Sequence, residues 1–460
     1  MSQHDATEST AALSDRPTKV RWIVFTLACG TSWMLYFHRY AFSLVKTFLI
    51  DEWGVSKEEL GYVDSVFSIC YAVFQVPAGL IADFLGTRLF LAACIGIWSG
   101  AVYGQTIAAN TTGLAWALGF SGMAQAGTYP MLNKVSRIWF PSSIRTTLQG
   151  WIGVFFGRLG GFSSHLIIMA LAIGFFHMPW QSAIRWAALA GVALMVLFYL
   201  YFRDTPKMHP HVNAAETALI DDRLPSPATP DKELPTENAN GESAEPIEKP
   251  SLWKLLASRN GLTFVWLMVQ TFLSTLADQF FVGWVSLFFK ESFKVTPIWL
   301  GILAGLPLLG GAVGGVLGGM LNDRLMARGV SRRWARSGVG LIGKGIAGIL
   351  LAIGVLLFLD NMYAMCVLLV VVKIFCDFSL SSTWGTVTDI SGKYSATVFA
   401  VNNGMASGAM IMMSPIIGKI ADAYKGWTEV LLLVAGIFVA CSLTWLMIDS
   451  ERKLFPDEGK

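Results

Sequence analysis

The segment Gly79-Leu-Ile-Ala-Asp-Phe-Leu-Gly-Thr-Arg88 lies between two long apolar runs, and a degenerate copy of it follows later in the chain. The second copy reads Gly319-Met-Leu-Asn-Asp-Arg-Leu-Met-Ala-Arg328. Gly79 and Asp83 recur as Gly319 and Asp323, in each case 240 positions later, and Leu60-Gly61 recurs as Leu300-Gly301 at the same offset. The repeat predicts two related halves, in each of which this segment is the loop between the second and third helices.

The composition indicates a protein that crosses a membrane many times. The 460 residues are 54% hydrophobic and only 14% charged, which is too apolar for an ordinary soluble protein. A bilayer core of about 30 Å needs roughly 20 apolar residues per helix. Twelve segments satisfy this, and they begin near Trp22, Glu59, Leu89, Thr112, Thr146, Ala183, Leu262, Trp299, Ser337, Met362, Thr397 and Glu429.

We therefore predict an all-α membrane protein with twelve transmembrane helices in two pseudo-symmetric six-helix halves. The predicted divisions are a cytoplasmic tail (1–21), the N-terminal half (22–203), a cytoplasmic link (204–258), the C-terminal half (259–449) and a second cytoplasmic tail (450–460). The link is rich in Pro, Glu and Asn, which is typical of a largely disordered segment. We expect no separate soluble domain.

The distribution of basic residues predicts the orientation. If the spans are right, most basic residues lie on one side of the membrane, namely Arg16, Lys19, Arg21, Arg88, Lys134, Arg137, Arg145, Arg324, Arg328, Arg332, Arg333, Arg336, Lys393, Arg452 and Lys453. The opposite loops carry few. Both termini should therefore face the cytoplasm.

Other sequence features exclude several classes of protein. The first twenty residues are polar, so no cleaved signal peptide is evident. All 6 cysteines fall inside predicted spans and show no metal or disulfide spacing. The net charge of +3 is too small to imply a nucleic-acid partner. His209 and His211, in the link, fit a solvated loop or one short surface helix better than a metal site.

Two arginines lie deep in predicted spans. Arg39 follows His38 in the first helix, and Arg158 lies near mid-depth in the fifth. Burying an arginine at a helix centre costs roughly 3 kcal/mol on insertion scales, so such a residue normally faces a cavity and has a partner. Arg39 has an alternative interpretation, in which it lies near the outer end and reaches the headgroups.

Polar residues suited to bind hydroxyl groups lie on the same helices as these arginines or on neighbouring ones: Tyr36, Tyr71, Gln75, Gln125 and Tyr129. Tyr71 and Gln75 are four residues apart and so share a helix face. In the C-terminal half, Asp278 lies among apolar neighbours. Lys373 and Asp377 are spaced to pair on one helix face, which is equally compatible with a structural role.

Two homologous six-helix halves predict a secondary transporter, whose substrate lies near the midplane between the halves. Arginine suits carboxylate, sulfonate or phosphate groups because its donors form a planar fork. Arg39 and Arg158 have no clear buried acid in their own half, which predicts an anionic substrate. No G-x-x-x-x-G-K-[ST] loop, nucleophile elbow or H-E-x-x-H motif occurs, so we expect neither an enzyme nor a cofactor or metal.

The first copy of the repeated loop resembles the G-x-x-x-D-x-x-G-x-R signature of the major facilitator superfamily, carried here by Gly79, Asp83, Gly86 and Arg88. This resemblance implies a gating loop, to which Asp323 and Arg324 would contribute from the second copy.

Further segments resemble the anion:cation symporter family, which includes hexuronate, galactonate, tartrate, phthalate and sialic-acid transporters. They are Tyr36-x-x-Arg39, Phe74-Gln-Val-Pro-Ala-Gly79, Trp139-Phe-Pro141, Asp204-Thr-Pro-x-x-His-Pro210 and Ser331-Arg-Arg-Trp-Ala-Arg336.

The resemblance implies substrate-binding roles for Arg39, Tyr36 and Tyr71, for the region from Ser381 to Trp384, and for Asn402 or Asn403. The chain also departs from the family pattern. His38 stands where an acid usually precedes the helix 1 arginine, Gln125 replaces the helix 4 glutamate, and Leu118 replaces the arginine before it. The usual coupling proton therefore lacks its usual carrier, and the alternatives are His38, Asp278 and Asp377, with Lys373 beside the last.

We expect a monomeric importer of a small organic anion in the cell inner membrane. It works by alternating access, is coupled to H⁺ or Na⁺, and has the lipid bilayer as its only other partner. One alternative is an organophosphate:phosphate antiporter. Another, of a different class, is a transporter-like sensor that signals through a partner.

Overall fold

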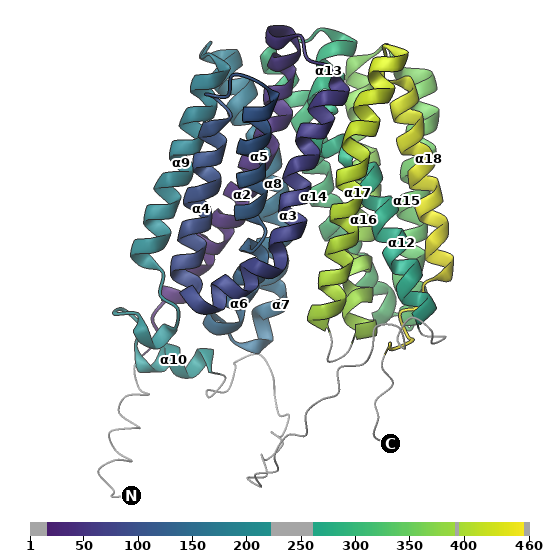
Figure 1. Cartoon of the computed structure of the whole chain (residues 1–460). Helices are drawn as coiled ribbons and strands as arrows, with labels where there is room; N and C mark the ends of the chain where they lie inside the picture. Colours follow the sequence, from purple (N-terminus) through teal and green to yellow (C-terminus); the bar gives the residue numbers. More distant parts are fainter. Residues whose placement is uncertain (1–15, 222–260, 392–394, 455–460) are drawn as a thin grey trace, which may run out of the picture.

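The computed structural model describes residues 16–221, 261–391 and 395–454, in which every regular element is a helix (Figure 1). The N-terminal half consists of α2 (Val20–Trp53), α3 (Lys57–Leu85), α4 (Thr87–Gly104), α5 (Thr111–Gln125), α6 (Thr128–Trp139), α7 (Ser142–Gly150), η1 (Trp151–Phe155), α8 (Phe156–Ser164), η2 (His165–Phe175) and α9 (Trp180–Tyr201). The C-terminal half consists of α12 (Gly261–Gly283), α13 (Val285–Phe293), α14 (Pro297–Ala327), α15 (Arg332–Phe358), α16 (Met362–Ser391), α17 (Ser395–Tyr424), α18 (Thr428–Thr444) and η5 (Trp445–Met447).

Within the described residues, 11 helices are long and apolar enough to cross a membrane. The remaining predicted span is present but divided into α5 and α6, with a break at Ala126 and Gly127. The fifth span is one continuous rod made of α7, η1, α8 and η2. The predicted twelve-helix layout in two halves is therefore confirmed.

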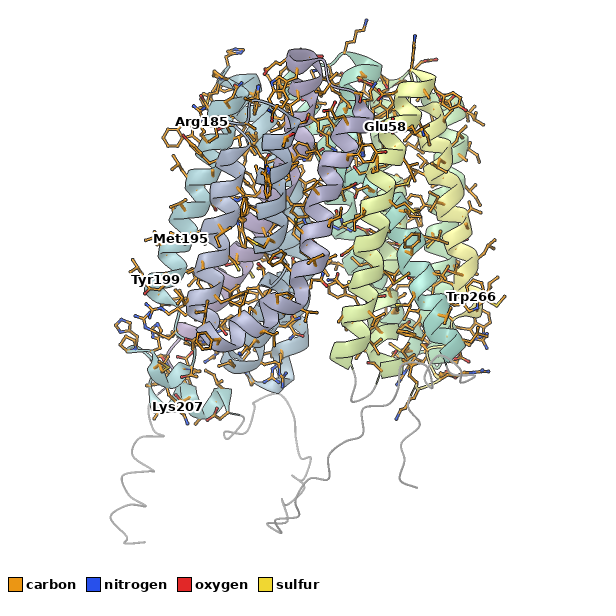
Figure 2. All side chains as sticks on the ribbon, viewed as in Figure 1. Glu58, Arg185, Met195, Tyr199, Lys207 and Trp266 are labelled. Carbon is orange, nitrogen blue, oxygen red and sulfur yellow. The ribbon has the colours of Figure 1, made fainter. Side chains whose placement is uncertain are left out.

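The order of the helices places the start of α2, α10 (Ala214–Ile220) and the end of α18 at one face, which we call the α10 face (Figure 1). The opposite face, which carries α13, is the α13 face. Glu58 and Arg185 lie toward the α13 face and Lys207 lies at the α10 face (Figure 2). The basic residues that the sequence analysis assigned to one side of the membrane lie at the α10 face, except Lys393, which lies outside the described residues.

The described part of the link is helical in two short stretches, as the alternative of a short helix in this segment allowed. It forms η3 (Pro206–Met208) and α10 (Ala214–Ile220). Glu216 is fully buried and accepts hydrogen bonds from the backbone N and the Nη1 of Arg21, both at 3.1 Å. His209 is buried against the rings of Trp139 and Tyr201, so the expected solvated loop is wrong at this histidine. The rest of the link lies outside the described residues.

The two halves meet most closely toward the α13 face. There α3 packs along α17: a Cβ added to Gly61 would lie 2.5 Å from the Cα of Pro415, so the two backbones touch. Ser65 donates a hydrogen bond to the carbonyl of Ile411 at 2.8 Å. Farther along α3, toward the α10 face, the side chains of Val76 and Phe84 are exposed. The two helices approach at one end and diverge toward the other (Figure 1).

Candidate functional site

Arg39 lies midway along α2 in a cage of aromatic rings. Its guanidinium carbon is 4.8 Å from the ring centroid of Phe67, 4.9 Å from that of Tyr71 and 5.5 Å from that of Tyr36. Its Nε is buried without a hydrogen-bond partner. Among the described residues, no carboxylate lies within ion-pair distance of Arg39. The aromatic faces stabilise the cation but leave its fork of donors free for an anion.

Arg158 lies in a different environment, within a cluster of four charges. Its Nη2 is 2.9 Å from Oδ2 of Asp377, and its Nη1 is 3.7 Å from Oδ2 of Asp278. Lys373 is fully buried and contacts both aspartates, at 2.9 Å for Asp377. Two cations face two anions, so the cluster is neutral. The acids that pair with Arg158 come from the other half, so the lack of an acid in its own half does not leave Arg158 free for an anionic substrate.

This cluster is a physical link between the halves. Arg158 belongs to α8, whereas Asp278 belongs to α12 and both Lys373 and Asp377 belong to α16. The Arg158–Asp377 contact is an ion pair and not a hydrogen bond, since Oδ2 of Asp377 has no hydrogen-bond partner. Asp278, Cys376 and Asp377 bring possible metal ligands together. The two carboxylates already contact two permanent cations, however, so we assign no metal there.

Tyr36 joins the two arginine environments. One face of its ring lies under Arg39, and its edge packs on α8, where a Cβ added to Gly157 would lie 2.9 Å from Cε2. Tyr129 lies beside it, with ring centroids 6.3 Å apart, and its hydroxyl is 2.9 Å from that of Ser32. Because Gly157 has no side chain, both tyrosines reach the helix that carries Arg158. Arg39 and Arg158 therefore border one inner surface.

The two glutamines that we predicted to bind substrate each have a buried polar atom without a hydrogen-bond partner. Nε2 of Gln75 and Oε1 of Gln125 have no hydrogen-bond partner, although Gln125 Nε2 donates to Ser121 at 3.4 Å. A buried polar atom without a partner costs free energy, so each is available to a ligand or to water. Gln75 follows Tyr71 by one helical turn, on the side of the Arg39 cage.

His38 does not face this surface. Successive residues on a helix point about 100° apart, and His38 is turned toward α9, where its Nε2 is 2.9 Å from the carbonyl oxygen of Ala187. A Cβ added to Gly191 of α9 would lie 2.5 Å from His38 Cε1, so the contact is tight. The expectation that His38 carries the coupling proton loses its support, because the ring is packed away from Arg39.

Four residues of the C-terminal half were predicted to touch substrate. Ser381 donates to the carbonyl of Gly315 at 2.7 Å, and Asn402 accepts from Thr271 at 2.6 Å, so both are held within their own half. Trp384 is partly exposed and reaches across to η1, where a Cβ added to Gly153 would lie 3.5 Å from its ring. Asn403 is exposed.

The repeated loop is held by its own half. The backbone N of Arg88 donates to Oδ1 of Asp204 at 2.8 Å, and its Nε donates to the carbonyl of Tyr199 at 2.8 Å. Gly86, between α3 and α4, has a φ of +77°. The side chains of Asp323 and Arg324 in the second copy are exposed. The side chain of Asp83, the acid of the first copy, is outside the described part of the structure.

Ion pairs of two lysines, between the inner surface around Arg39 and the α13 face, were not predicted from the sequence. Lys46 of α2 is fully buried and pairs with Asp64 of α3. Nearer the α13 face, Nζ of Lys57 lies 3.2 Å from a carboxylate oxygen of Glu291 and 3.4 Å from one of Asp422. These two ion pairs join the N-terminal half to the C-terminal half. The signal was present in the sequence, since Asp64 is a lone acid within an apolar run.

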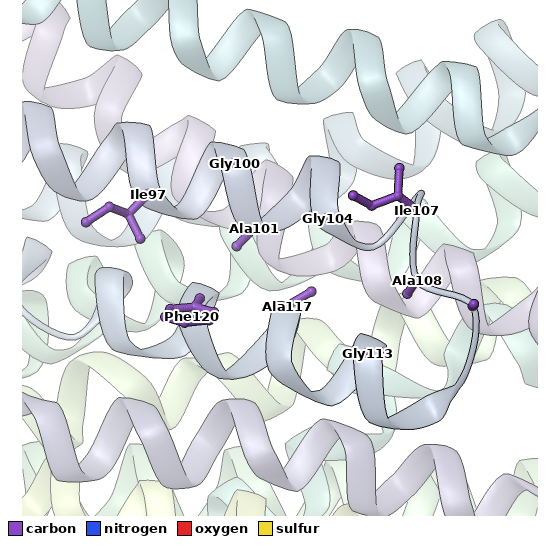
Figure 3. A pocket seen from close by; sticks show the side chains of 10 residues that line it. Ile97, Gly100, Ala101, Gly104, Ile107, Ala108, Gly113, Ala117 and Phe120 are labelled. Carbon is purple, nitrogen blue, oxygen red and sulfur yellow. The ribbon is translucent and has the colours of Figure 1, made fainter.

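A groove of about 520 Å³ lies between α4 and α5 (Figure 3). Its lining is apolar, with Ile97, Ile107 and Phe120 exposed along it. It offers no charged or hydroxyl group to an anion. The candidate site is therefore the inner surface around Arg39 and not this groove.

The sequence pattern of the Major Facilitator Superfamily matches residues 28–347. The chain belongs to this superfamily. It is 29% identical to the probable galactarate/D-glucarate transporter GudP of Bacillus subtilis, over 94% of this chain and 92% of that protein. It is 26% identical to the probable sulfoacetate transporter SauU of Cupriavidus necator, over 87% and 86% of the two chains. It is 24% identical to a D-galactonate transporter of Escherichia coli, over 95% and 97%.

The predicted resemblance to anion:cation symporters is thereby confirmed, and the chain is a membrane transporter and not an enzyme. Among solved structures, it superposes on a bacterial homolog of the human lysosomal transporter Spinster with a TM-score of 0.69. That match covers 93% of this chain and 98% of the other at 16% identity, and it shows the fold alone.

Proposed function

We propose that this protein imports a small organic anion by alternating access and that Arg39 binds the anionic group. One observation carries the proposal: Arg39 is a mid-membrane cation with an unsatisfied Nε and no carboxylate partner among the described residues. An unpaired buried charge is costly, so a ligand that supplies the missing anion is the natural partner.

The chemistry around Arg39 favours a hydroxylated acid. A carboxylate or sulfonate accepts two parallel hydrogen bonds from the guanidinium fork. Tyr36, Tyr71, Gln75, Gln125 and Tyr129 would then bind hydroxyl groups. The relatives named above carry galactarate or glucarate, galactonate and sulfoacetate by their names, all of which have a carboxylate or sulfonate.

The four-charge cluster gives the substrate a means of acting on the halves. A second acidic group that reached Arg158 would compete with Asp377, 2.9 Å away on the other half. Exchange of an ion pair between halves for an ion pair with substrate changes the relative stability of the two conformations. A dicarboxylate would use both arginines, whereas a monocarboxylate would use Arg39 alone.

The orientation and location follow from charge. The basic loops at the α10 face would lie in the cytoplasm by the positive-inside rule, so the contacts at the α13 face close the outer side. We place the protein in the cell inner membrane with both termini cytoplasmic. The driving ion, H⁺ or Na⁺, belongs to the same proposal.

The test is uptake into proteoliposomes of radiolabelled D-glucarate, D-galactonate, D-galacturonate and sulfoacetate, with D-glucose as the neutral control. We expect one acid class to enter, and Arg39→Ala to abolish its entry. Arg185→Ala is the matched control, because Arg185 lies toward the α13 face and binds Thr106 at 3.0 Å. Full uptake by Arg39→Ala would sink the assignment.

The same vesicles separate the alternatives. Strong stimulation of uptake by internal inorganic phosphate would favour a phosphate exchanger. Binding of an acid without any uptake would favour a sensor. Neither alternative gains a specific contact in the structure, since α12 offers Asp278 to the site and no arginine.

A further inference from the structure

Asp64 lies on α3 one layer nearer the α13 face than Arg39. Its carboxylate contacts the ammonium of Lys46, which is fully buried, and 16% of its side chain is exposed. Lys46 also lies 4.1 Å from the ring centroid of Trp284. A buried charge pair is costly unless its geometry and remaining hydrogen bonds compensate for lost hydration. Such a pair in a membrane helix is a candidate for a functional role.

Both members of the pair hold the two halves together. Ser414 of α17 donates a hydrogen bond to Oδ2 of Asp64 at 2.7 Å. Lys46 donates to the carbonyl of Gly283, at the end of α12, at 3.3 Å. Asp64 and Lys46 belong to the N-terminal half, and their two partners belong to the C-terminal half. Separation of the halves at the α13 face must therefore break both contacts and expose the carboxylate.

Asp64 also faces Arg39. A cavity of about 40 Å³ between the halves is lined by Arg39, Ser43, Asp64, Ser68 and Gln279, together with apolar side chains. This volume holds one to a few water molecules. The charged groups that face Asp64 are Lys46 and Arg39 of α2. Its other polar neighbours are the Gly283 carbonyl and Gln279 of α12 and Ser414 of α17. A proton on Asp64 is thus electrostatically linked to an anion on Arg39.

The remaining acids in the membrane part are less suited to carry a proton. Asp278 and Asp377 each contact both Arg158 and Lys373. Among the described residues, Lys46 is the single cation within ion-pair distance of Asp64.

We propose that Asp64 is the proton-binding group that couples transport, with the proton entering from the α13 face and leaving toward the α10 face. This rests on the proposed function, because it assigns the coupling site of the same transport cycle.

In the proposed cycle, opening and closing of the α13 face control the proton on Asp64. When the α13 face is open, Asp64 has lost Ser414 and takes a proton from the outer water. A neutral Asp64 leaves Lys46 and Arg39 as two cations, which strengthens anion binding at Arg39. Closure restores the Ser414 and Gly283 contacts, which favour the Asp64 carboxylate, and the proton passes through the cavity toward the opening side. One proton and one anion cross per turn.

The test separates exchange from coupling in proteoliposomes. Counterflow of a labelled acid needs no net proton movement, whereas accumulation driven by an inward proton gradient does. We expect Asp64→Asn, and the doubly neutral Lys46→Met/Asp64→Asn, to exchange the acid in counterflow but to lose gradient-driven accumulation. The double variant guards against the buried lysine that Asp64→Asn alone leaves unpaired. Asp51→Asn is the control and should keep accumulation, since Asp51 pairs with Lys290 and is exposed.

Several outcomes would overturn the inference. Accumulation by either neutral variant would show that Asp64 does not carry the proton. Two results with the wild type would show the same: uptake that does not acidify the vesicle interior, as followed by a trapped pH dye, and uptake that responds to a sodium gradient alone. These outcomes leave anion import intact. Failure of wild-type counterflow with every acid would instead overturn the proposed function itself.

Discussion

Removal of Arg39 and removal of Arg158 should damage the protein in opposite ways. Among the described residues, Arg158→Ala leaves Asp377 and Asp278 with Lys373 as their one ion-pair partner. Loss of one partner from a buried ion pair costs about 3–5 kcal/mol, so the free energy of unfolding should fall by that order. Arg39→Ala breaks no ion pair. It loses cation–π contacts of about 0.5–2 kcal/mol each but removes an unpaired cation that costs roughly 3 kcal/mol to bury. The net change in stability should be small.

For an acid that uses Arg39 alone, the effect of the two substitutions on ligand binding is reversed. Arg39 is proposed to hold the anion directly, and truncation of one member of a buried, hydrogen-bonded charge pair costs about 2–5 kcal/mol. At about 1.4 kcal/mol per tenfold, the Kd should rise about 30- to 4,000-fold. A ligand at 100 times the wild-type Kd stabilises the wild type by about 2.7 kcal/mol, whereas a 30-fold weaker variant gains less than about 1 kcal/mol.

Thermal unfolding of purified protein, with and without the acid that the uptake assay identifies, measures both quantities. Arg39→Ala should unfold near the wild-type temperature and lose the ligand-induced shift. Arg158→Ala should unfold at a clearly lower temperature. Arg39→Lys is the matched variant, since it keeps the charge but not the planar fork, and should recover part of the shift. A full ligand shift in Arg39→Ala, or a loss of stability equal to that of Arg158→Ala, would refute the reasoning.

Three further predictions test the surrounding structure. Gly61→Val should bind the acid in thermal-shift assays but fail to transport it, because a Cβ at Gly61 lies 2.5 Å from Pro415 and prevents α3 from closing on α17; normal uptake would contradict this. Glu216→Gln should lower the free energy of unfolding by about 1–3 kcal/mol, since it removes a buried charged acceptor of Arg21; Glu429→Gln, at an exposed position, should not. Asp204→Ala should lower the free energy of unfolding by about 0.5–2 kcal/mol, because Asp204 accepts a hydrogen bond from the backbone N of Arg88 at the start of α4. Thermal unfolding measures this change, and an unchanged melting temperature would mean that water replaces the carboxylate.

The sequence-based prediction and the structure agree on the features that follow from the thickness and apolarity of a bilayer. The twelve apolar segments predicted from the sequence correspond to the twelve spans of the structure, because a chain in hydrocarbon must satisfy its backbone hydrogen bonds within helices. The divided fourth span was not predicted, because a run of small residues such as those around Ala126-Gly127 is compatible with an unbroken helix. The buried contact between Glu216 and Arg21 was also not predicted, since the polar composition of the link does not reveal it.

The sequence by itself determined which residues are charged within the membrane and in which half they lie. Arg39, Arg158, Asp278, Lys373 and Asp377 could all be named from the chain. Only the tertiary structure decided which of them remain available to a ligand. Arg158 is neutralised by acids far away in sequence, whereas Arg39 packs among aromatic rings and has no carboxylate within ion-pair distance among the described residues. The physical reason is that charge compensation depends on distances of a few ångströms between separate helices, and a helical period in one segment does not specify what faces it from another.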